Sequence, residues 1–169
     1  MPGSNILVAG IGNIFFSDDG FGCAVAARLQ SVPLPDGVRV VDYGIRGVHL
    51  RYDLLDGVDA LVLVDAVPPS IGTGDAAPGT VVSMQIGADD VGGGSVDAHG
   101  MSATAVLAGL GSLGAALPST YLVGCVPAEI GDGMGLSTPV EQAVGPAAEA
   151  VLDLVGELVG ASTPSTAVR

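Results

Sequence analysis

Short runs of apolar residues alternate along this chain with segments whose apolar residues recur at helical spacing. The runs predict five β-strands, at 6–9, 38–43, 60–64, 80–86 and 120–126. The helical spacing predicts helices over 20–30, 48–55, 101–110 and from 138 to about 159. The first and third runs are wholly apolar, as in strands buried on both faces, whereas the fourth alternates like an edge strand. This order predicts a three-layer α/β/α sandwich with a mostly parallel sheet.

The composition fits a single packed domain. Of 169 residues, 49% are apolar, and we expect one domain over 1–160 with a flexible C-terminal tail at 161–169. The net charge of -13 would repel phosphate, so nucleic acid is not an expected partner. No signal peptide and no apolar run of about 18 residues is visible, which predicts a cytoplasmic protein without a membrane partner. The two cysteines, Cys23 and Cys125, have apolar neighbours and are expected to be buried, reduced thiols.

A glycine turn follows the first strand, at the position where open α/β sheets bind their ligands. Gly10 and Gly12 form the turn and resemble the start of a dinucleotide-binding fingerprint, and Asp42 stands where a ribose-binding acid would. Two features disfavour dinucleotide binding. Phe15 replaces the third glycine, and the carboxylates at 18 and 19 put negative charge at the helix terminus that would receive the pyrophosphate.

Three side chains that can bind a metal lie at what this fold makes one edge of the sheet. Asp19 comes after the first strand, Asp65 ends the third, and His99 precedes the predicted helix at 101–110. Two carboxylates and one imidazole suit a divalent transition ion such as Zn²⁺ or Ni²⁺. Three protein ligands would leave coordination positions open for water or for a group on a partner. We therefore expect Asp19, Asp65 and His99 to converge.

Each of these residues also has a purely structural alternative. Asp18 and Asp19 can cap the helix that follows them, where a carboxylate offsets the helix dipole. Asp65 can cap a turn, although a carboxylate that closes a wholly apolar strand is costly without a partner. His99 can be an ordinary loop residue. His49, in the short second helix, is expected to be solvated or hydrogen-bonded rather than a metal ligand.

Several motifs in a fixed order give the chain a resemblance to a known family. They lie between about 6 and 159 and comprise Gly10-x-Gly12-Asn13-x-x-x-x-Asp18-Asp19-Gly20-x-Gly22, Asp42-x-Gly44-x-x-Gly47, Val64-Asp65-Ala66, the His99 loop, Val123-Gly124-x-x-Pro127 and Gly135-Leu136-Ser137-Thr138-Pro139-Val140-Glu141. With them the chain resembles the hydrogenase maturation proteases, the endopeptidases that trim the large subunit of NiFe hydrogenases.

The resemblance implies a five-stranded sheet with one antiparallel strand, and it implies that Asp19, Asp65 and His99 are the catalytic, metal-contacting residues. Some relatives carry Glu where this chain has Asp19, and the shorter side chain leaves Asp18 and Asp19 as alternatives. The family's substrate is a precursor whose C-terminal extension is removed after nickel has entered it. The nickel would therefore arrive with the precursor and bridge it to the enzyme, and another divalent transition ion is a candidate for the same position in vitro.

The loop at 42–47 is expected to border the same space and to recognise the substrate through Asp42, Gly44, Arg46 and Gly47. Its glycines permit close approach of a substrate to the backbone. Arg46 is one of five basic residues, and it can pair with a carboxylate of the precursor or be an ordinary exposed loop arginine. The glycines at 92–94 would let His99 move into place when substrate or metal arrives.

Two functions remain open on these residues. The first is an endopeptidase that removes the C-terminal extension of a nickel-loaded hydrogenase large-subunit precursor, with the metal placing the precursor or activating the attacking water. The second is a non-catalytic, metal-dependent chaperone that binds a metalloenzyme subunit without cutting it. The chain contains neither H-E-x-x-H nor Gly-x-Ser-x-Gly, so the common metalloprotease and serine-hydrolase signatures are absent. The trio is thus the visible candidate for catalytic chemistry.

Overall fold

The five predicted strands form one mixed sheet in the computed structural model, which describes residues 3–69, 75–87 and 117–162. The strand order is β2-β1-β3-β5-β4. All neighbours pair in parallel except β4 and β5, which are antiparallel, so both the mostly parallel sheet and its one antiparallel strand are confirmed. The bounds are β1 Ile6–Ile11, β2 Val38–Gly44, β3 Ala60–Ala66, β4 Val81–Ile86 and β5 Ser119–Cys125.

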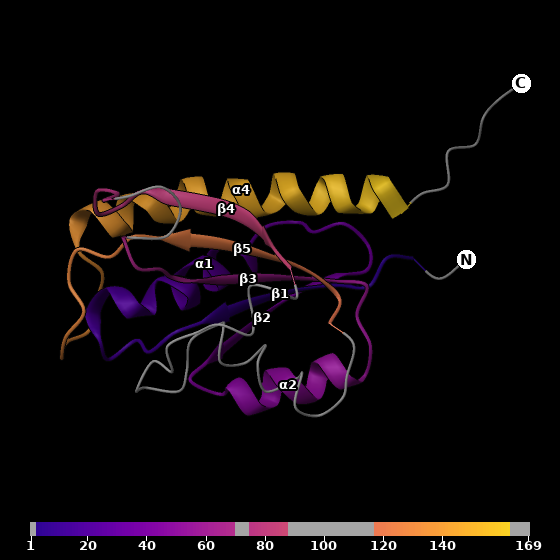
Figure 1. Ribbon diagram of the computed structural model, residues 1–169, viewed down its shortest axis with the longest axis horizontal. Coiled ribbons are helices and arrows are strands. Elements are labelled where there is room, and N and C mark those ends of the chain that lie inside the picture. The colour runs from indigo at the N-terminus through magenta and orange to yellow at the C-terminus, as the bar shows by residue number, and fades with distance from the viewer. Residues whose placement is uncertain (1–2, 70–74, 88–116, 163–169) are drawn as a thin grey trace, which may run out of the picture.

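Helices cover both faces of the sheet, which confirms the three-layer α/β/α sandwich (Figure 1). On one face α1 (Phe21–Leu29) and α4 (Thr138–Ser162) pack against β1, β3 and β5, and on the other α2 (Gly47–Leu55) packs beneath them. Alternate residues of each central strand therefore enter different cores, which explains the wholly apolar runs in the sequence. Among the described helices, none has the length and apolar composition needed to span a membrane. The helix predicted at 101–110 lies outside the described residues.

Two element boundaries differ from the sequence-based expectation. A short 3-10 turn, η1 (Ser17–Gly20), precedes α1, so the first helix begins at Phe21, one residue after the predicted start. Helix α4 begins at Thr138 as predicted. The carbonyl of Ser137 accepts the first intrahelical bond from the amide of Glu141 at 2.8 Å, so Ser137 is the N-cap residue, and its hydroxyl donates to Asp18. The helix continues through Pro146 to its end at Ser162, beyond the predicted end near 159.

Helix α1 lies directly on the sheet because two facing glycines remove the side chains between them. A Cβ atom at Gly22 would lie 2.2 Å from the carbonyl oxygen of Val64 in β3 and 2.3 Å from that of Ile11 in β1. A Cβ atom at Gly10 would lie 2.5 Å from the carbonyl oxygen of Gly22. Since real contacts are never this short, no larger residue fits at either position without moving the helix.

The turn that connects β1 to η1 is equally close-packed. Gly12 has φ +149, and a Cβ atom there would lie 1.9 Å from the carbonyl oxygen of Asp19. Glycine is required on both counts, because the dihedral is one that L side chains rarely adopt and the space is already filled. The three glycines together fix the positions of Asp19 and of the first turn of α1 relative to the ends of β1 and β3.

We expect Gly22→Ala to destabilise the protein by about 3 kcal/mol, because the added methyl overlaps two backbone carbonyls that cannot rotate away. Gly156→Ala is the matched control, since a Cβ atom at this exposed position of α4 meets nothing within 4 Å. The control should raise stability by about 0.5–1 kcal/mol through helix propensity. Urea denaturation followed by circular dichroism measures both. Equal stability of Gly22→Ala and the wild type would contradict the close helix–sheet contact.

Candidate active site

The loops that follow neighbouring parallel strands lie together at one edge of the sheet, where the carboxyl ends of these strands meet. Gly10 of β1 pairs with Asp42 of β2 on one side and with Val64 of β3 on the other. Asp65, the next residue of β3, pairs with Gly124 of β5. Asp42 and Asp65 therefore lie on either side of the glycine turn, at the end of the sheet toward which β5 points (Figure 1).

Asp18 is fully buried and joins η1 to the loop before α4. Its carboxylate accepts hydrogen bonds from the amides of Ala128 at 2.8 Å, Glu129 at 2.9 Å and Ser137 at 2.7 Å, and from the Ser137 hydroxyl at 2.8 Å. Burial raises the pKa of this carboxyl, but the hydrogen bonds from Ser137, Glu129 and Ala128 outweigh it and leave the pKa below its usual value. Asp18 is thus a structural residue, although it does not cap α1 as one alternative held.

Asp19 differs from its neighbour because it remains partly exposed. Its Oδ2 accepts a hydrogen bond from the amide of Asn13 at 3.0 Å, which holds the carboxylate against the glycine turn. The N-cap of α1 is Gly20, and no side chain caps this helix, so the capping alternative is wrong for Asp19 as well. Of the two adjacent aspartates, Asp19 is the one that keeps carboxylate surface available for chemistry.

The pKa of the buried Cys23 thiol is affected by the carboxylates beside the turn. Its pKa is raised to about 12, first by burial, then by a hydrogen bond with Asp42, and then by the negative charges of Asp42, Asp65 and Asp19. Asp65 is only 7% exposed, and its Oδ1 accepts a hydrogen bond from the amide of Ala66 at 2.8 Å. The strand register places Asp42 and Asp65 at the ends of the two strands that flank β1, and the Asn13 amide holds Asp19 at the turn after β1.

A cleft of about 390 Å³ opens beside this group, between the glycine turn and the loop at 42–47. Its described lining residues include Gly12, Ile14, Phe15, Cys23, Asp42, Gly44, Ile45 and Arg46. The predicted recognition residues Asp42, Gly44 and Arg46 thus form one wall of the cleft, whereas Gly47 is buried as the first residue of α2. The remaining walls are mainly apolar, as in most sites that bind an extended ligand.

Arg46 stabilises the wall of the cleft. Its guanidinium donates hydrogen bonds to the carbonyl of Asp42 at 2.8 Å and to that of Tyr43 at 3.2 Å, across the turn made by Gly44. Gly44 has φ +55, and its amide donates to Oδ1 of Asp42 at 3.0 Å. Arg46 is exposed, but these bonds make it more than an ordinary loop arginine, because they fix the shape of the loop.

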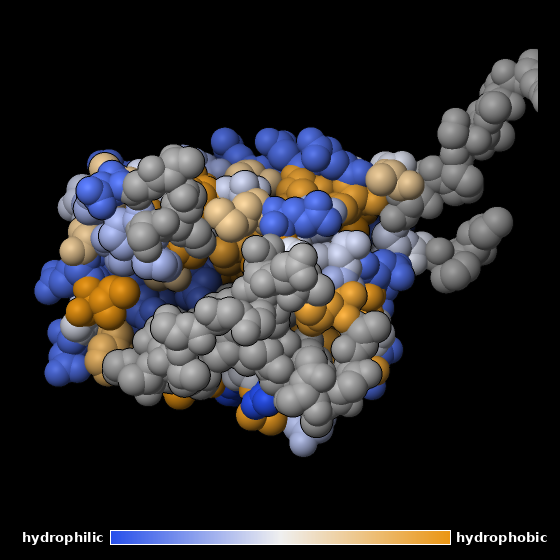
Figure 2. Space-filling model, viewed as in Figure 1, coloured by the Kyte–Doolittle hydropathy of each residue, from blue (hydrophilic) through white to orange (hydrophobic). Residues whose placement is uncertain are grey.

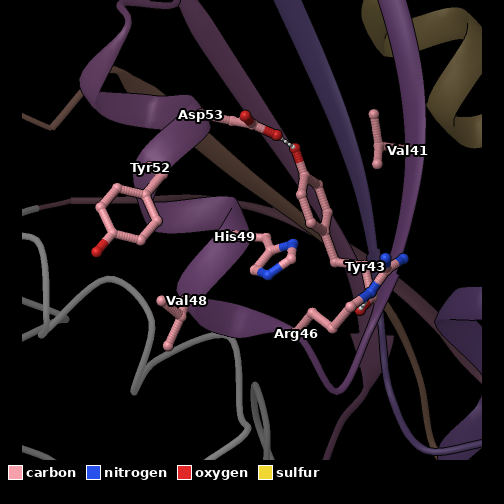
Figure 3. A pocket seen from close by; sticks show the side chains of 7 residues that line it. All are labelled: Val41, Tyr43, Arg46, Val48, His49, Tyr52 and Asp53. Atoms are coloured by element: carbon pink, nitrogen blue, oxygen red, sulfur yellow. Dashed lines mark hydrogen bonds between the residues drawn. The ribbon is translucent and has the colours of Figure 1, made fainter.

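A second cavity of about 410 Å³ lies on the other side of the same loop, between β2 and α2 (Figure 3). The Tyr43 hydroxyl donates a hydrogen bond to Asp53 there, and burial together with this bond and the Asp53 charge raises the pKa of Tyr43. His49 points into this cavity from α2, and its expected role as a non-ligand stays a prediction. The Tyr43–Asp53 bond joins β2 to α2 and so supports the wall of the cleft from behind.

The third predicted ligand, His99, lies outside the described residues, as do the glycines at 92–94. Over the ranges 3–69, 75–87 and 117–162, no group of three His, Cys, Asp or Glu side chains could hold a metal ion by itself. Metal binding by Asp19, Asp65 and His99 therefore stays a prediction.

The chain matches the family model described as hydrogenase maturation protease over residues 23–154. This protein belongs to the hydrogenase maturation protease family. It is 30% identical to the hydrogenase 2 maturation protease of Escherichia coli over 168 residues, which cover 97% of this chain and 98% of that protein. It is 34% identical to the hydrogenase expression/formation protein HupM of Azotobacter chroococcum over 173 residues, covering 97% of this chain and 78% of the relative.

A solved structure supports the same family. The hydrogenase maturating endopeptidase HybD of Escherichia coli superposes with a TM-score of 0.76 at 30% identity, covering 91% of this chain and 93% of that one. The resemblance inferred from the motifs is therefore confirmed, and the endopeptidase interpretation is favoured over the chaperone.

The sequence of this hydrogenase maturation protease did not reveal that Cys23 lies beside the cleft, although the burial of its thiol was predicted correctly. The signal was available, because residues 19 and 23 are four positions apart and such residues share one side of a helical segment. The sequence also did not reveal the exposed apolar residues Ile14 and Phe15 in the cleft wall. No pattern distinguishes these from core residues, since their exposure depends on the turn that presents them.

We expect Asp18→Asn to cost about 3 kcal/mol of stability at pH 7, because the amide cannot accept all four bonds and presents a donor to backbone amides. The lowered pKa means that Asp18 stabilises the fold above its unfolded value near 4, and that this contribution is lost as pH falls through the folded pKa. The stability gap between wild type and variant should therefore shrink on acidification. Urea titrations from pH 7 down to about pH 3 measure it, with the exposed Asp56→Asn as control. A gap that stays constant with pH would contradict the assignment.

Proposed function

We propose that this hydrogenase maturation protease removes the C-terminal extension of a nickel-loaded NiFe hydrogenase large-subunit precursor, in the cytoplasm. The proposed catalytic and metal-contacting residues are Asp19, Asp65 and His99. The observation that supports this most is the strand register, which puts Asp65 at the end of β3, directly beside β1 and its glycine turn, where the Asn13 amide holds Asp19. Two carboxylates at neighbouring strand ends, one of them partly exposed, suit both metal contact and proton transfer.

The nickel belongs to the substrate in this proposal. Oxygen atoms of Asp19 and Asp65, with the imidazole of His99, would fill coordination positions that the precursor leaves open. Only a precursor that already holds its metal would then be aligned with the enzyme, which makes nickel the recognition signal. This alignment supplies the proximity and orientation that peptide hydrolysis requires.

Peptide hydrolysis then needs a proton taken from the attacking water and a proton given to the leaving amine. A carboxylate can perform the first step and, once protonated, the second. Asp19 is the candidate for this role because it is partly exposed, whereas Asp65 is nearly buried. The mainly apolar lining formed by Ile14, Phe15 and Ile45 would limit the access of bulk water to the scissile bond.

A cysteine-protease mechanism is disfavoured by the same geometry. Three carboxylates and burial hold the Cys23 thiol protonated, with a pKa of about 12. The thiolate is the reactive form of cysteine, so at neutral pH Cys23 is a poor nucleophile. The sulfur also lies 3.6 Å from the carbonyl oxygen of Gly12, at the glycine turn.

The substrate would lie against the loop at 42–47. Arg46 is occupied by the carbonyls of Asp42 and Tyr43, so we assign it to shaping this loop, and Gly44 to close contact between the loop and the substrate backbone. Asp42 would serve recognition from the same wall, because its side chain is held by the Gly44 amide and lines the cleft.

We expect Asp19→Asn, Asp65→Asn and His99→Ala each to lower the rate of precursor cleavage by about 10²–10⁴-fold, the usual range for loss of an acid–base group. Mass spectrometry of purified nickel-loaded precursor after incubation with each variant measures the released extension. Asp56→Asn is the matched control, since this exposed carboxylate lies at the far end of α2. Circular dichroism of each variant checks that it is folded. Normal cleavage by all three variants would refute the proposed site.

We also expect the wild-type enzyme to leave a nickel-free precursor uncut, because the carboxylates would then have no ion to contact. Loading the same precursor sample with Ni²⁺ should restore cleavage. The same mass measurement before and after loading tests this, with a mature large subunit that lacks the extension as the blank. Equal cleavage rates with and without nickel would show that the metal is not the recognition signal.

A further inference from the structure

Large apolar side chains are exposed on two neighbouring loops beside the cleft. On the loop after β1, Ile14 is 45%, Phe15 60% and Phe16 37% exposed, and on the loop before α4, Ile130 is 57% and Met134 72% exposed. We call these five residues the apolar rim. Apolar surface is visible at this end of the molecule in Figure 2. Exposure of single apolar residues is ordinary, but a group of this size on adjoining loops is typical of a binding surface.

The two loops of the apolar rim are held together by backbone hydrogen bonds. The amide of Ser17 donates to the carbonyl of Gly133 at 2.8 Å, and the amide of Gly133 donates to the carbonyl of Phe15 at 2.9 Å. The Ser17 hydroxyl adds a bond to the carbonyl of Gly131 at 3.0 Å. Beneath them, the buried Asp18 carboxylate binds three amides and a hydroxyl of the second loop. The rim is therefore one ordered unit rather than two independent loops.

The backbone at the rim has an unusual conformation. Ser17 has φ +52, which is uncommon for a residue other than glycine. This turn directs the chain so that Asp18 points into the protein while Phe15 and Phe16 stay at the surface. The bonds of Asp18 stabilise the turn, but the exposure of the aromatic groups does not stabilise the fold, and a surface already ordered before binding loses less entropy when a partner covers it.

We propose that the apolar rim is the docking surface for the folded body of the large-subunit precursor, and this inference rests on the proposed function. The apolar rim is continuous with the cleft, because Ile14 and Phe15 belong both to the rim and to the lining of the cleft. A peptide tail bound in the cleft therefore leaves the domain that carries it against the rim. The partner surface that fits is an apolar patch next to the base of the C-terminal extension.

The charges around the rim indicate which charges the partner surface should carry. Glu129 and Asp132 are both exposed on the second loop, flanking Ile130, and the whole chain carries a net charge of -13. A complementary surface has an apolar centre and basic residues at its periphery, where they oppose these carboxylates. Burial of the rim side chains supplies the affinity, and the surrounding charges supply orientation.

The affinity of an uncleavable complex tests this docking surface. The background is Asp65→Asn, and biolayer interferometry measures the Kd for nickel-loaded precursor. We expect Met134→Ser or Phe16→Ser to weaken binding about tenfold each, as central apolar contacts do, which corresponds to about 1.4 kcal/mol. Leu55→Ser is the matched control, because Leu55 is 48% exposed on α2, away from the rim, and should bind like the background.

Steady-state cleavage in the otherwise wild-type enzyme gives a second readout. With Met134→Ser, the loss should appear in KM for the precursor more than in kcat, because Met134 is not among the residues that line the cleft. Unchanged Kd and KM in both rim variants would overturn the inference. So would sedimentation showing that wild-type protein is a dimer which the rim variants convert to monomer, since a second copy would then be the occupant. Rim-dependent binding without any cleavage by the wild type would support docking while refuting the proposed protease function.

Discussion

The contact between α1 and the sheet is the constraint on which the site depends. Gly10 and Gly22 leave no side chain between the helix and strands β1 and β3, so the backbone of the helix sits against two strand carbonyls. Gly12 lets the carbonyl of Asp19 approach the turn in the same way. Because these are contacts between backbones, they fix Asp19 and Cys23 relative to the ends of the strands far more tightly than flexible side chains would.

The adjacent residues Asp18 and Asp19 have different environments in this structure. Asp18 is removed from water and therefore needs its four hydrogen bonds, which it takes from residues 128, 129 and 137. Those bonds bring the loop before α4 to the edge of the cleft. Asp19 has one bond to the amide of Asn13 and keeps part of its surface exposed. Asp18 thus positions the surface around the site, and Asp19 remains available for the proposed reaction.

Much of the fold was predictable from the sequence because burial leaves a simple pattern. The wholly apolar runs at β1 and β3 could be read directly, since both faces of a central strand are covered. The polar alternation of β4 indicated an edge strand, but its antiparallel direction came from the family resemblance, because strand direction leaves no pattern in the residues.

The site itself was only partly predictable. Asp65 could be found because a carboxylate at the end of an apolar strand needs an explanation. Asp18 and Asp19 could not be separated, because the partners of Asp18 lie 110 to 119 positions away in the sequence. The role of Cys23 and the exposure of Phe15 also depend on contacts between distant segments.

The central claim is that Asp19 and Asp65 share one ion while Asp18 does not. The most direct measurement is anomalous diffraction at the nickel absorption edge from crystals of the wild-type protein in complex with a nickel-loaded large subunit. The account predicts a nickel peak beside the glycine turn, with carboxylate oxygens of Asp19 and Asp65 both at about 2.0–2.2 Å, the range for such ligands. Nickel in contact with neither carboxylate, or bound by one of these two residues with the other turned away, would contradict it.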